Sequence, residues 1–583
     1  MTQAAFLNVE TSLSGRRWIG PSAEELRQAE AIQQISGLDE PTARILAARG
    51  VPPEETESFL NPKLRDLMPD PRKLRDLERA ATRLVEAVSR KDRIAIFADY
   101  DVDGGTSAAL LLDWLRQQGQ NATLYVPDRI DEGYGPNPPA MRALAEAHDL
   151  IVCVDCGTLS FDAIAAAADA DVVIIDHHLA EIELPQALAV VNPNRQDETG
   201  DLAHLCAAAV VFLVLVEANR QSRAAGRTTP DLMAMLDLVA LATVADVAPL
   251  VGLNRALVTQ GLKIMSARQR PGLAALADVA GLDTPPAAYH LGYVIGPRVN
   301  AGGRVGRADL GARCLSATDP DEARALADRL DELNRERREI EAQVRDAALT
   351  QAEARGLDGP LVWAAGENWH PGVVGIVAAR LKEATQRPAV VIGLENGEGK
   401  GSGRSVRGID LGSAVQKLAA EGLLVKGGGH KMAAGLTVAV DQIEAAMERL
   451  GVLLARQGAG DTGPRDLRID AALMPGAATV DLVTQIEAAG PFGQSAPAPR
   501  FAFPDVQILH ARQVGSGHLK ISFGDGLGSK MDAIAFDAWN DPMGEALSQS
   551  RGTRFHLAGR LGINHWGGRQ SVELRLEDAA PTG

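Results

Sequence analysis

The chain is poor in cysteine and has no excess of positive charge, and each shortage excludes a class of protein. Only four cysteines occur among 583 residues, too few for a framework of disulfide bonds. Lysine and arginine number 59 against 76 acidic residues, which gives a formal net charge of −17. Overall charge therefore does not hold this protein on DNA or on a membrane, although a local basic groove is compatible with the total.

Long apolar runs are also missing. The longest, Leu205 to Val216, is too short to cross a bilayer. The first 18 residues lack the charged and apolar segments of a secretory signal. The composition, 46% hydrophobic and 23% charged, is globular rather than disordered. We therefore expect a soluble, cytoplasmic protein without membrane contact, and about 150 residues per domain allows three or four domains.

Five short apolar runs near the start of the chain predict a parallel sheet. They are rich in β-branched residues, do not alternate with polar residues and are separated by helix-like stretches, which suits strands buried on both faces. The runs are residues 93–98, 122–126, 150–154, 171–175 and 188–192. The sequence thus predicts an α/β, doubly wound fold, in which ligands bind at the carboxyl ends of the strands.

The rest of the chain predicts several further parts. Residues 320–355 begin with Asp-Pro, contain many i,i+4 charge pairs and have no internal Gly or Pro, which predicts one long and largely solvated helix. A Gly/Pro/Asn-rich loop is expected at 295–307, a second loop at 397–405 and a glycine turn at 427–430. The predicted divisions are an N-terminal helical segment (1–62), a catalytic domain (63–318), the connecting helix (319–356), a smaller α/β domain (357–457) and a β-barrel of OB type (464–583).

Acidic residues follow three of the predicted strands and end one helix. Asp101 and Asp103 come after the first strand, Asp155 after the third, the run Asp176 to His178 after the fourth, and Asp246 at a helix end. Each alone is more often a turn residue or a helix cap. Together at one edge of a sheet, carboxylates repel one another unless cations neutralise them. Oxygen ligands with one or two imidazoles favour Mn²⁺ or Mg²⁺, so the pattern predicts metal-assisted hydrolysis of a phosphoester.

Two later segments supply candidate phosphate contacts. Arg298 and Arg304 flank Asn300, and guanidinium groups match phosphate oxygens; the alternative is a structural loop anchored by arginine. Ser402 and Arg404 combine a hydroxyl, a guanidinium and backbone amides that suit a terminal phosphate.

A glycine-rich segment further on is a weaker candidate. Gly428 and Gly429, beside His430, permit close approach of a DNA backbone. The alternative is an ordinary glycine-rich hairpin.

The motifs DYDVDG, VDCG, DHH and ATVADVAPL, in this order, resemble those of the DHH phosphoesterase superfamily. The segments PRVNAGGR, WHPGVVGIVAARL, GSGRS and GGGHKMAAG narrow the resemblance to the RecJ exonuclease family with its DHHA1 domain, and GPFGQ and HLKISF resemble its OB domain. The resemblance implies an exonuclease that uses Mn²⁺ or Mg²⁺ to degrade single-stranded DNA from the 5′ end, releasing 5′-mononucleotides in recombination and repair.

The resemblance also implies roles for particular residues. The expected ligands of one metal ion are Asp103, Asp155, His177 and Asp246, and those of a second ion are Asp101 and Asp155. His178 would contact the scissile phosphate or assist the leaving oxygen, and Asp176 would orient the histidines. Recognition of the 5′ end falls to Arg129, Ser402 and Arg404. Phe97 stands where related DHH pyrophosphatases have a histidine, which argues against tight occupancy of the second metal site.

The implied partners are single-stranded DNA with a 5′ end, a DNA helicase and a single-strand-binding protein, and the implied state is a monomer. Two alternatives stay open. A DHH phosphodiesterase would act on oligoribonucleotides or cyclic dinucleotides, but the terminal barrel argues against it. A non-catalytic replication or repair scaffold is the other alternative, and the filled ligand positions argue against that.

Overall fold

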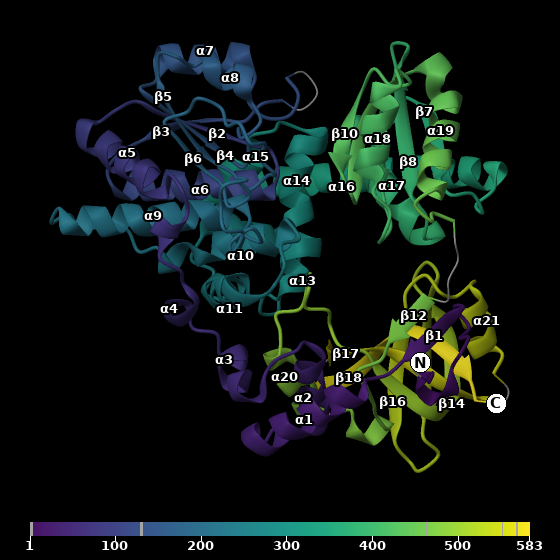
Figure 1. Ribbon diagram of the computed structural model, residues 1–583. Helices are drawn as coiled ribbons and strands as arrows, with labels where there is room; N and C mark the ends of the chain where they lie inside the picture. Colours follow the sequence, from purple (N-terminus) through teal and green to yellow (C-terminus); the bar gives the residue numbers. More distant parts are fainter. Residues whose placement is uncertain (1–3, 129–131, 461–464, 551, 567–568, 583) are drawn as a thin grey trace. The chain divides into compact units, whose positions relative to one another are not determined.

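The chain forms two compact units (Figure 1) in the computed structural model, which describes residues 4–128, 132–460, 465–550, 552–566 and 569–582. The larger unit contains Met68–Ala248 and Leu257–Asp461. The smaller unit joins Met1–Leu67 and Pro249–Ala256 to Thr462–Gly583. None of the described helices has the length and apolarity that a membrane crossing needs.

A parallel five-stranded sheet lies at the centre of the first part of the larger unit. Its strand order is β3-β2-β4-β5-β6, and every neighbouring pair is parallel. The strands are β2 (Ile94–Ala98), β3 (Ala122–Tyr125), β4 (Leu150–Val154), β5 (Asp171–Ile175) and β6 (Ala189–Val191). All five predicted strands are confirmed. The central β2 and β4 are buried at every residue, as their unbroken apolar sequences require.

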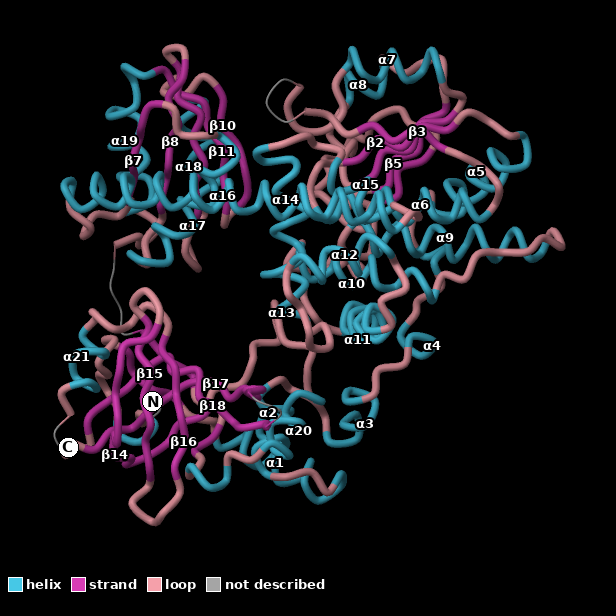
Figure 2. The backbone as a smooth tube through the Cα atoms, turned by 180° about the vertical axis from the view of Figure 1, so that it is seen from behind, coloured by secondary structure: helices cyan, strands magenta, loops and turns pink. Residues whose placement is uncertain are grey.

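Helices cover both faces of this sheet (Figures 1 and 2). One face carries α5 (Leu77–Arg90), α6 (Val102–Gln117) and α9 (Ala207–Ala224), and the other carries α7 (Pro138–Ala147) and α8 (Phe161–Ala165). Met141 and Ile164 from the second pair pack on Phe97 and Ile174 of the strands. The doubly wound prediction is therefore confirmed.

A helical layer follows the sheet. It consists of α10 (Leu236–Ala245), α11 (Gly252–Ser266), α12 (Pro271–Val279), α13 (Ala288–His290), the π-helical turn η5 (Leu291–Ile295), α14 (Gly296–Val305) and α15 (Leu310–Ser316). The loop predicted at 295–307 is wrong, because most of it is α14. Its glycines serve close packing rather than a turn: a Cβ atom on Gly303 would lie 2.3 Å from the ring of Tyr100.

The predicted long helix is α16 (Pro320–Arg355). Asp319 caps it by accepting hydrogen bonds from the amides of Asp321 and Glu322. The expectation that it is largely solvated is only half right, because one face is buried against α12, α14 and the later helix α17 (Pro371–Thr385). The buried side chains include Leu326, Leu330, Leu333 and Val344.

The second sheet has the order β10-β11-β9-β8-β7. Its strands are β7 (Val362–Glu367), β8 (Ala389–Glu395), β9 (Glu398–Arg404), β10 (Lys426–His430) and β11 (Ala433–Ala439); its helices are α17 (Pro371–Thr385), α18 (Leu411–Ala420) and α19 (Ile443–Ala455). The loop predicted at 397–405 is strand β9 instead, and the turn predicted at 427–430 is strand β10. A Cβ atom on Gly399, Gly401 or Gly403 would lie 2.7 Å from a facing apolar side chain, so these glycines make room for the core.

The smaller unit is built around a closed barrel. The barrel strands are β14 (Phe501–Val514), β15 (His518–Gly524), β16 (Lys530–Ala535), β17 (Arg554–Trp566) and β18 (Arg569–Pro581), and pairing of β14 with β17 closes it. The other elements of this unit are β1 (Arg16–Ile19), α1 (Ala23–Ser36), α2 (Glu40–Ala48), α3 (Thr56–Leu60), α4 (Leu64–Leu67), β12 (Arg465–Arg468), β13 (Ala471–Ala472), α20 (Val480–Ala488) and α21 (Pro542–Ser548). The predicted terminal barrel is confirmed.

The N-terminal segment is part of the barrel unit. Strand β1 pairs in parallel with β12, so the segment is not only helical. Nε1 of the buried Trp18 donates a hydrogen bond to Oδ2 of the buried Asp578, at 2.9 Å.

Short 3₁₀ turns lie at Phe6–Asn8, Pro53–Glu55, Pro71–Lys73, Met233–Met235, Val440–Gln442 and Pro475–Ala477.

Candidate metal centre

The turn between β2 and α6 brings three acids to the carboxyl end of the sheet. Asp101 is the N-cap of α6, and its Oδ1 accepts from the amides of Asp103 at 2.9 Å and Gly104 at 3.1 Å. A Cβ atom on Gly104 would lie 2.4 Å from the carbonyl oxygen of Asp99. The tight turn thus needs glycine at this position, and it draws Asp99 inward together with Asp101 and Asp103.

Asp103 is held by the start of another helix. Its two carboxylate oxygens accept from the amides of Ala207, at 2.7 Å, and Ala208, at 2.8 Å, the first residues of α9. These amides are donors that an α-helix leaves without internal partners. The carboxylate is buried and fixed in place, with lone pairs remaining for a cation.

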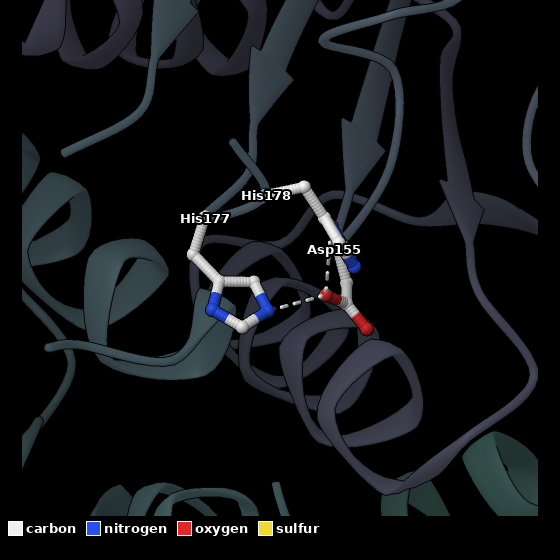
Figure 3. Close-up of side chains that lie close together, drawn as sticks. All are labelled: Asp155, His177 and His178. Atoms are coloured by element: carbon white, nitrogen blue, oxygen red, sulfur yellow. Dashed lines mark ion pairs between the residues drawn. The ribbon is translucent and has the colours of Figure 1, made fainter. Parts of the chain in front are cut away.

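Asp155 follows β4 and lies at the middle of the group. Its backbone is left-handed, with φ of 60°, and the residue is only 3% exposed. Nε2 of His177 lies 3.3 Å from Oδ1 of Asp155, and Nδ1 of His178 lies 3.9 Å from the same atom (Figure 3). Among the described residues none donates a hydrogen bond to this oxygen. A buried carboxylate oxygen without a donor is what a bound cation would satisfy.

The segment after β5 places two histidines on one buried carboxylate. Oδ1 of Asp176 accepts from the amides of His177 and His178 and lies 2.8 Å from Nδ1 of His178. Burial alone would raise the pKa of Asp176, but the bonds from His178 and Thr158 hold it well below its ordinary value. Burial opposes protonation of His178, yet the bond to Asp176 raises its pKa to about 9. Asp176 therefore orients the ring of His178 directly and holds His177 through its backbone amide.

Asp246 completes the group from a different layer. It is the C-cap residue of α10, and its Oδ2 lies 3.8 Å from Nδ1 of His177. Nε2 of the same ring lies 3.6 Å from Oδ2 of Asp103. One imidazole thus stands between an acid from the first turn of α6 and an acid from the end of α10.

Three overlapping sets of side chains lie close enough to share a metal ion, with one ligand atom of each residue within 4.8 Å of the others: Asp155, His177 and His178; Asp103, His177 and Asp246; and Asp99, Asp101 and Asp155. Burial, followed by neighbouring acids, raises the pKa of Asp155 and raises that of Asp246 to about 8. Such crowding is costly without cations. Oxygen and imidazole donors fit Mn²⁺ or Mg²⁺, so the residues present suit the predicted cofactor.

The structure adds residues that the sequence reasoning left out of the site. Asp99, Asp155 and Asp176 each come directly after the last residue of neighbouring strands paired in register, and this shared position was the available signal for Asp99. The side-chain amides of Asn192 and Asn194 donate to the carbonyls of His178 and His177, fixing the histidine segment. The sequence feature that could have indicated Asn192 and Asn194 is the Asn-Pro-Asn that follows the fifth strand.

Tyr134 also reaches the centre. Its hydroxyl lies 3.2 Å from Nε2 of His178 and 3.3 Å from the carbonyl oxygen of Asp155. Phe97, at the position of a histidine in related pyrophosphatases, is buried and stacked on Tyr125; Asp99 supplies an oxygen donor two residues later.

The first predicted phosphate contacts have structural partners. Nε of Arg298 lies 2.9 Å from Oδ1 of Asp331, and Nη1 of Arg304 donates to the carbonyl of Gly372 at 2.9 Å. Oδ1 of Asn300 accepts from the amide of Val102, at 3.0 Å. These contacts join α14 to α16, to α17 and to the turn between β2 and α6 that carries Asp101 and Asp103. Arg129 lies outside the described residues.

The remaining predicted contacts are on the second sheet. Ser402 and Arg404 are two residues apart on β9, and Nη1 of Arg404 donates to Oγ of Ser402 at 3.0 Å. A Cβ atom on Gly375, near the start of α17, would lie within 3.1 Å of both side chains. Gly428, Gly429 and His430 lie on β10, an edge strand. The hydroxyl and guanidinium are therefore paired at the N-terminal part of a helix.

Comparison with known proteins gives matches over most of the chain. Family models match at residues 93–243 (DHH family, N-terminal domain), 358–455 (DHHA1 domain) and 469–578 (RecJ OB domain). The single-stranded-DNA-specific exonuclease RecJ of Escherichia coli (strain K12) is 35% identical over 560 residues, covering 92% of this chain and 95% of its own length. RecJ of Bacillus subtilis (strain 168) is 32% identical over 547 residues, covering 92% and 67%.

A solved structure agrees with these sequence matches. The crystal structure of RecJ from Thermus thermophilus in complex with Mn²⁺ superposes with a TM-score of 0.79 at 30% identity, covering 96% of this chain and 79% of that one. The corresponding Mg²⁺ complex has a TM-score of 0.74 at 28% identity, covering 97% and 78%.

Proposed function

The chain belongs to the RecJ family of exonucleases, and from this membership we propose that it is a metal-dependent exonuclease that degrades single-stranded DNA in the 5′→3′ direction and releases 5′-mononucleotides. The observation that carries the proposal is the group of acids and imidazoles gathered around Asp155 at the carboxyl edge of the sheet. The role that we propose for the protein is in DNA recombination and repair. The matched segments lie inside the predicted domain boundaries, which we retain as part of the proposal.

Mn²⁺ or Mg²⁺ is the proposed cofactor. We assign one ion to Asp103, Asp155, His177 and Asp246, and a second to Asp101 and Asp155, now with Asp99. When bound, these ions supply Lewis acidity toward a phosphodiester oxygen. The protein contributes a rigid cage: Asp103 is fixed by the start of α9 and His177 by the Asn194 side chain.

His178 has a separate task in this proposal. Its Nδ1 is bound to Asp176, which leaves Nε2, near the hydroxyl of Tyr134, as the atom that faces substrate. Nε2 would contact the scissile phosphate or assist the leaving oxygen. Fixing one ring nitrogen orients the other, as in other sites where imidazoles act.

We assign capture of the 5′ end to Ser402 and Arg404, with Arg129. The hydroxyl and guanidinium of the first two lie 3.0 Å apart, a spacing that lets both reach one phosphate. The other predicted contacts with the DNA backbone stay predictions: Arg298, Asn300, Arg304, Gly428, Gly429 and His430. An enzyme confined to single strands depends on other proteins to unwind and coat them, so we infer a helicase and a single-strand-binding protein as partners. We also infer a monomer located with the DNA in the cytoplasm.

The test is digestion of one long 5′-phosphorylated DNA strand, labelled at either end, with and without Mn²⁺. We expect labelled mononucleotide at once from the 5′-labelled strand and a gradually shortening ladder from the 3′-labelled strand. Loss of the 3′ label first would contradict the proposed polarity. Cleavage of two- to five-nucleotide RNA in preference to the long strand would favour the oligoribonucleotide phosphodiesterase, and no cleavage with Mn²⁺ would favour the scaffold.

A further inference from the structure

Two of the five tyrosines of this chain form an exposed aromatic pair. Tyr289 on α13 and Tyr293 on η5 have ring centroids 5.1 Å apart and planes inclined by 24°. They are 52% and 74% exposed. Large aromatic groups gathered on a surface point to a binding role more often than single ones do.

The pair lies on a segment that packs against residues adjacent in sequence to the candidate metal ligands. A Cβ atom on Gly292 would lie 3.4 Å from Cγ1 of Val244, and one on Gly296 would lie 3.4 Å from Cβ of Ala245 and 3.8 Å from Cγ2 of Val102. Ala245 precedes Asp246, and Val102 lies between Asp101 and Asp103. The turn that carries Tyr293 therefore packs against α10, which ends at Asp246, and continues into α14, which packs against the side chain of Val102 between Asp101 and Asp103.

The local backbone around the pair is unusual in two ways. Tyr293 lies within a single π-helical turn, a feature concentrated at functional sites. Val247, directly after Asp246, has a φ of 60° and is 63% exposed, and a β-branched residue is seldom left-handed. Strain of this kind persists where the surroundings impose it, often beside a site. Val247 thus exposes an apolar side chain directly beside Asp246 in the chain.

We propose that Tyr289 and Tyr293 form a stacking platform for bases of the DNA strand whose phosphodiester lies at the metal centre. The inference rests on the proposed function. Every base has a π face, so stacking on aromatic rings holds a single strand without selecting its sequence. An exonuclease that removes each nucleotide in turn needs this tolerance. A base paired in a duplex has both faces covered, so the platform also favours single strands.

The test compares Tyr293→Ala, Tyr293→Leu, Tyr293→Phe and Tyr289→Ala with wild type on two substrates. One is a 5′-phosphorylated oligodeoxynucleotide, and the other is the p-nitrophenyl ester of thymidine 5′-monophosphate, which has no further base to stack. We expect the Ala and Leu variants to raise the KM for the strand about tenfold, with kcat within about twofold of wild type, and Phe to keep the wild-type KM. Hydrolysis of the ester stays unchanged in all four. Ile35→Ala, which truncates an exposed apolar residue of the other unit, is the control.

A fluorescent base gives a direct readout of stacking. A strand with one 2-aminopurine, bound to the proposed non-cleaving Asp155→Asn protein, should be quenched in the Tyr293→Phe background and not in the Tyr293→Leu background. An unchanged KM in the Ala and Leu variants would overturn the inference, and the pair would then be a surface for a protein partner. Equal loss of ester hydrolysis would show a purely structural role. If wild type itself leaves the strand intact, the proposed function fails instead.

Discussion

Replacing Asp155 by asparagine should make the metal-free protein more stable while abolishing its response to Mn²⁺. Asp155 is buried, and its Oδ1 receives no hydrogen bond from the described residues. Asparagine is a close match in size, and it is one of the few residues that adopt a φ near 60° readily. The change removes a carboxyl group whose charged form is opposed by burial and by the neighbouring Asp103 and Asp101.

The magnitude follows from the unsatisfied oxygen. A buried polar group without a partner costs about 1–3 kcal/mol, and more when it is charged. We therefore expect the metal-free variant to gain about 1–3 kcal/mol, a rise in Tm of a few degrees. Wild type at a Mn²⁺ concentration about 100 times its Kd should gain about 2.7 kcal/mol, and the variant almost none. Exonuclease activity should fall at least about a thousandfold, since the ions supply several kcal/mol of transition-state stabilisation.

Thermal unfolding at pH 7.5, in EDTA and then in Mn²⁺, measures the stability of the metal-free protein and the stability gained from the metal. Digestion of a labelled strand measures the exonuclease activity. Asp169→Asn makes the same change at an exposed position of the same domain and should leave all three values as in wild type. The reasoning is refuted if the variant is less stable than wild type in EDTA, or if Mn²⁺ still raises its Tm.

Three further predictions concern other parts of the protein. In the metal-free protein the pKa of Asp246 is raised to about 8, so above about pH 4 the folded state binds more protons than the unfolded state. The Tm in EDTA should therefore fall as the pH rises to about 8, and the increase in Tm on adding Mn²⁺ should grow. A Tm that does not change with pH would contradict this. Gly104→Ala should destabilise the larger unit by about 1–3 kcal/mol and remove activity, because the new methyl group meets the backbone of Asp99 at 2.4 Å; retention of both in unfolding and nuclease assays would show that the turn can relax. Trp18→Phe should lower the free energy of unfolding of the smaller unit by about 1–3 kcal/mol in a denaturant titration, because it removes the donor to the buried Asp578, and a neutral result would mean that water replaces that donor.

The sequence determined the parallel sheet and the gathering of acidic residues at its edge. Strands of unbroken apolar residues must be covered on both faces, which makes them parallel and brings their carboxyl ends to one edge. Acids that follow such strands meet regardless of how many residues separate them, so the sequence alone was enough to place Asp101 and Asp176 near Asp155. These acids lie close together because neighbouring parallel strands end at the same edge of the sheet.

Only the tertiary structure decided what the glycine-rich and arginine-rich segments do. A glycine in a sequence is equally compatible with a turn and with close packing, and the difference depends on a distant partner: the ring of Tyr100 for Gly303, and the side chain of Leu436 for Gly401. Likewise Arg298 faces Asp331, 33 residues away. Such partners come together only when the helices and sheets have packed, because short-range sequence patterns carry no record of contacts made across the fold.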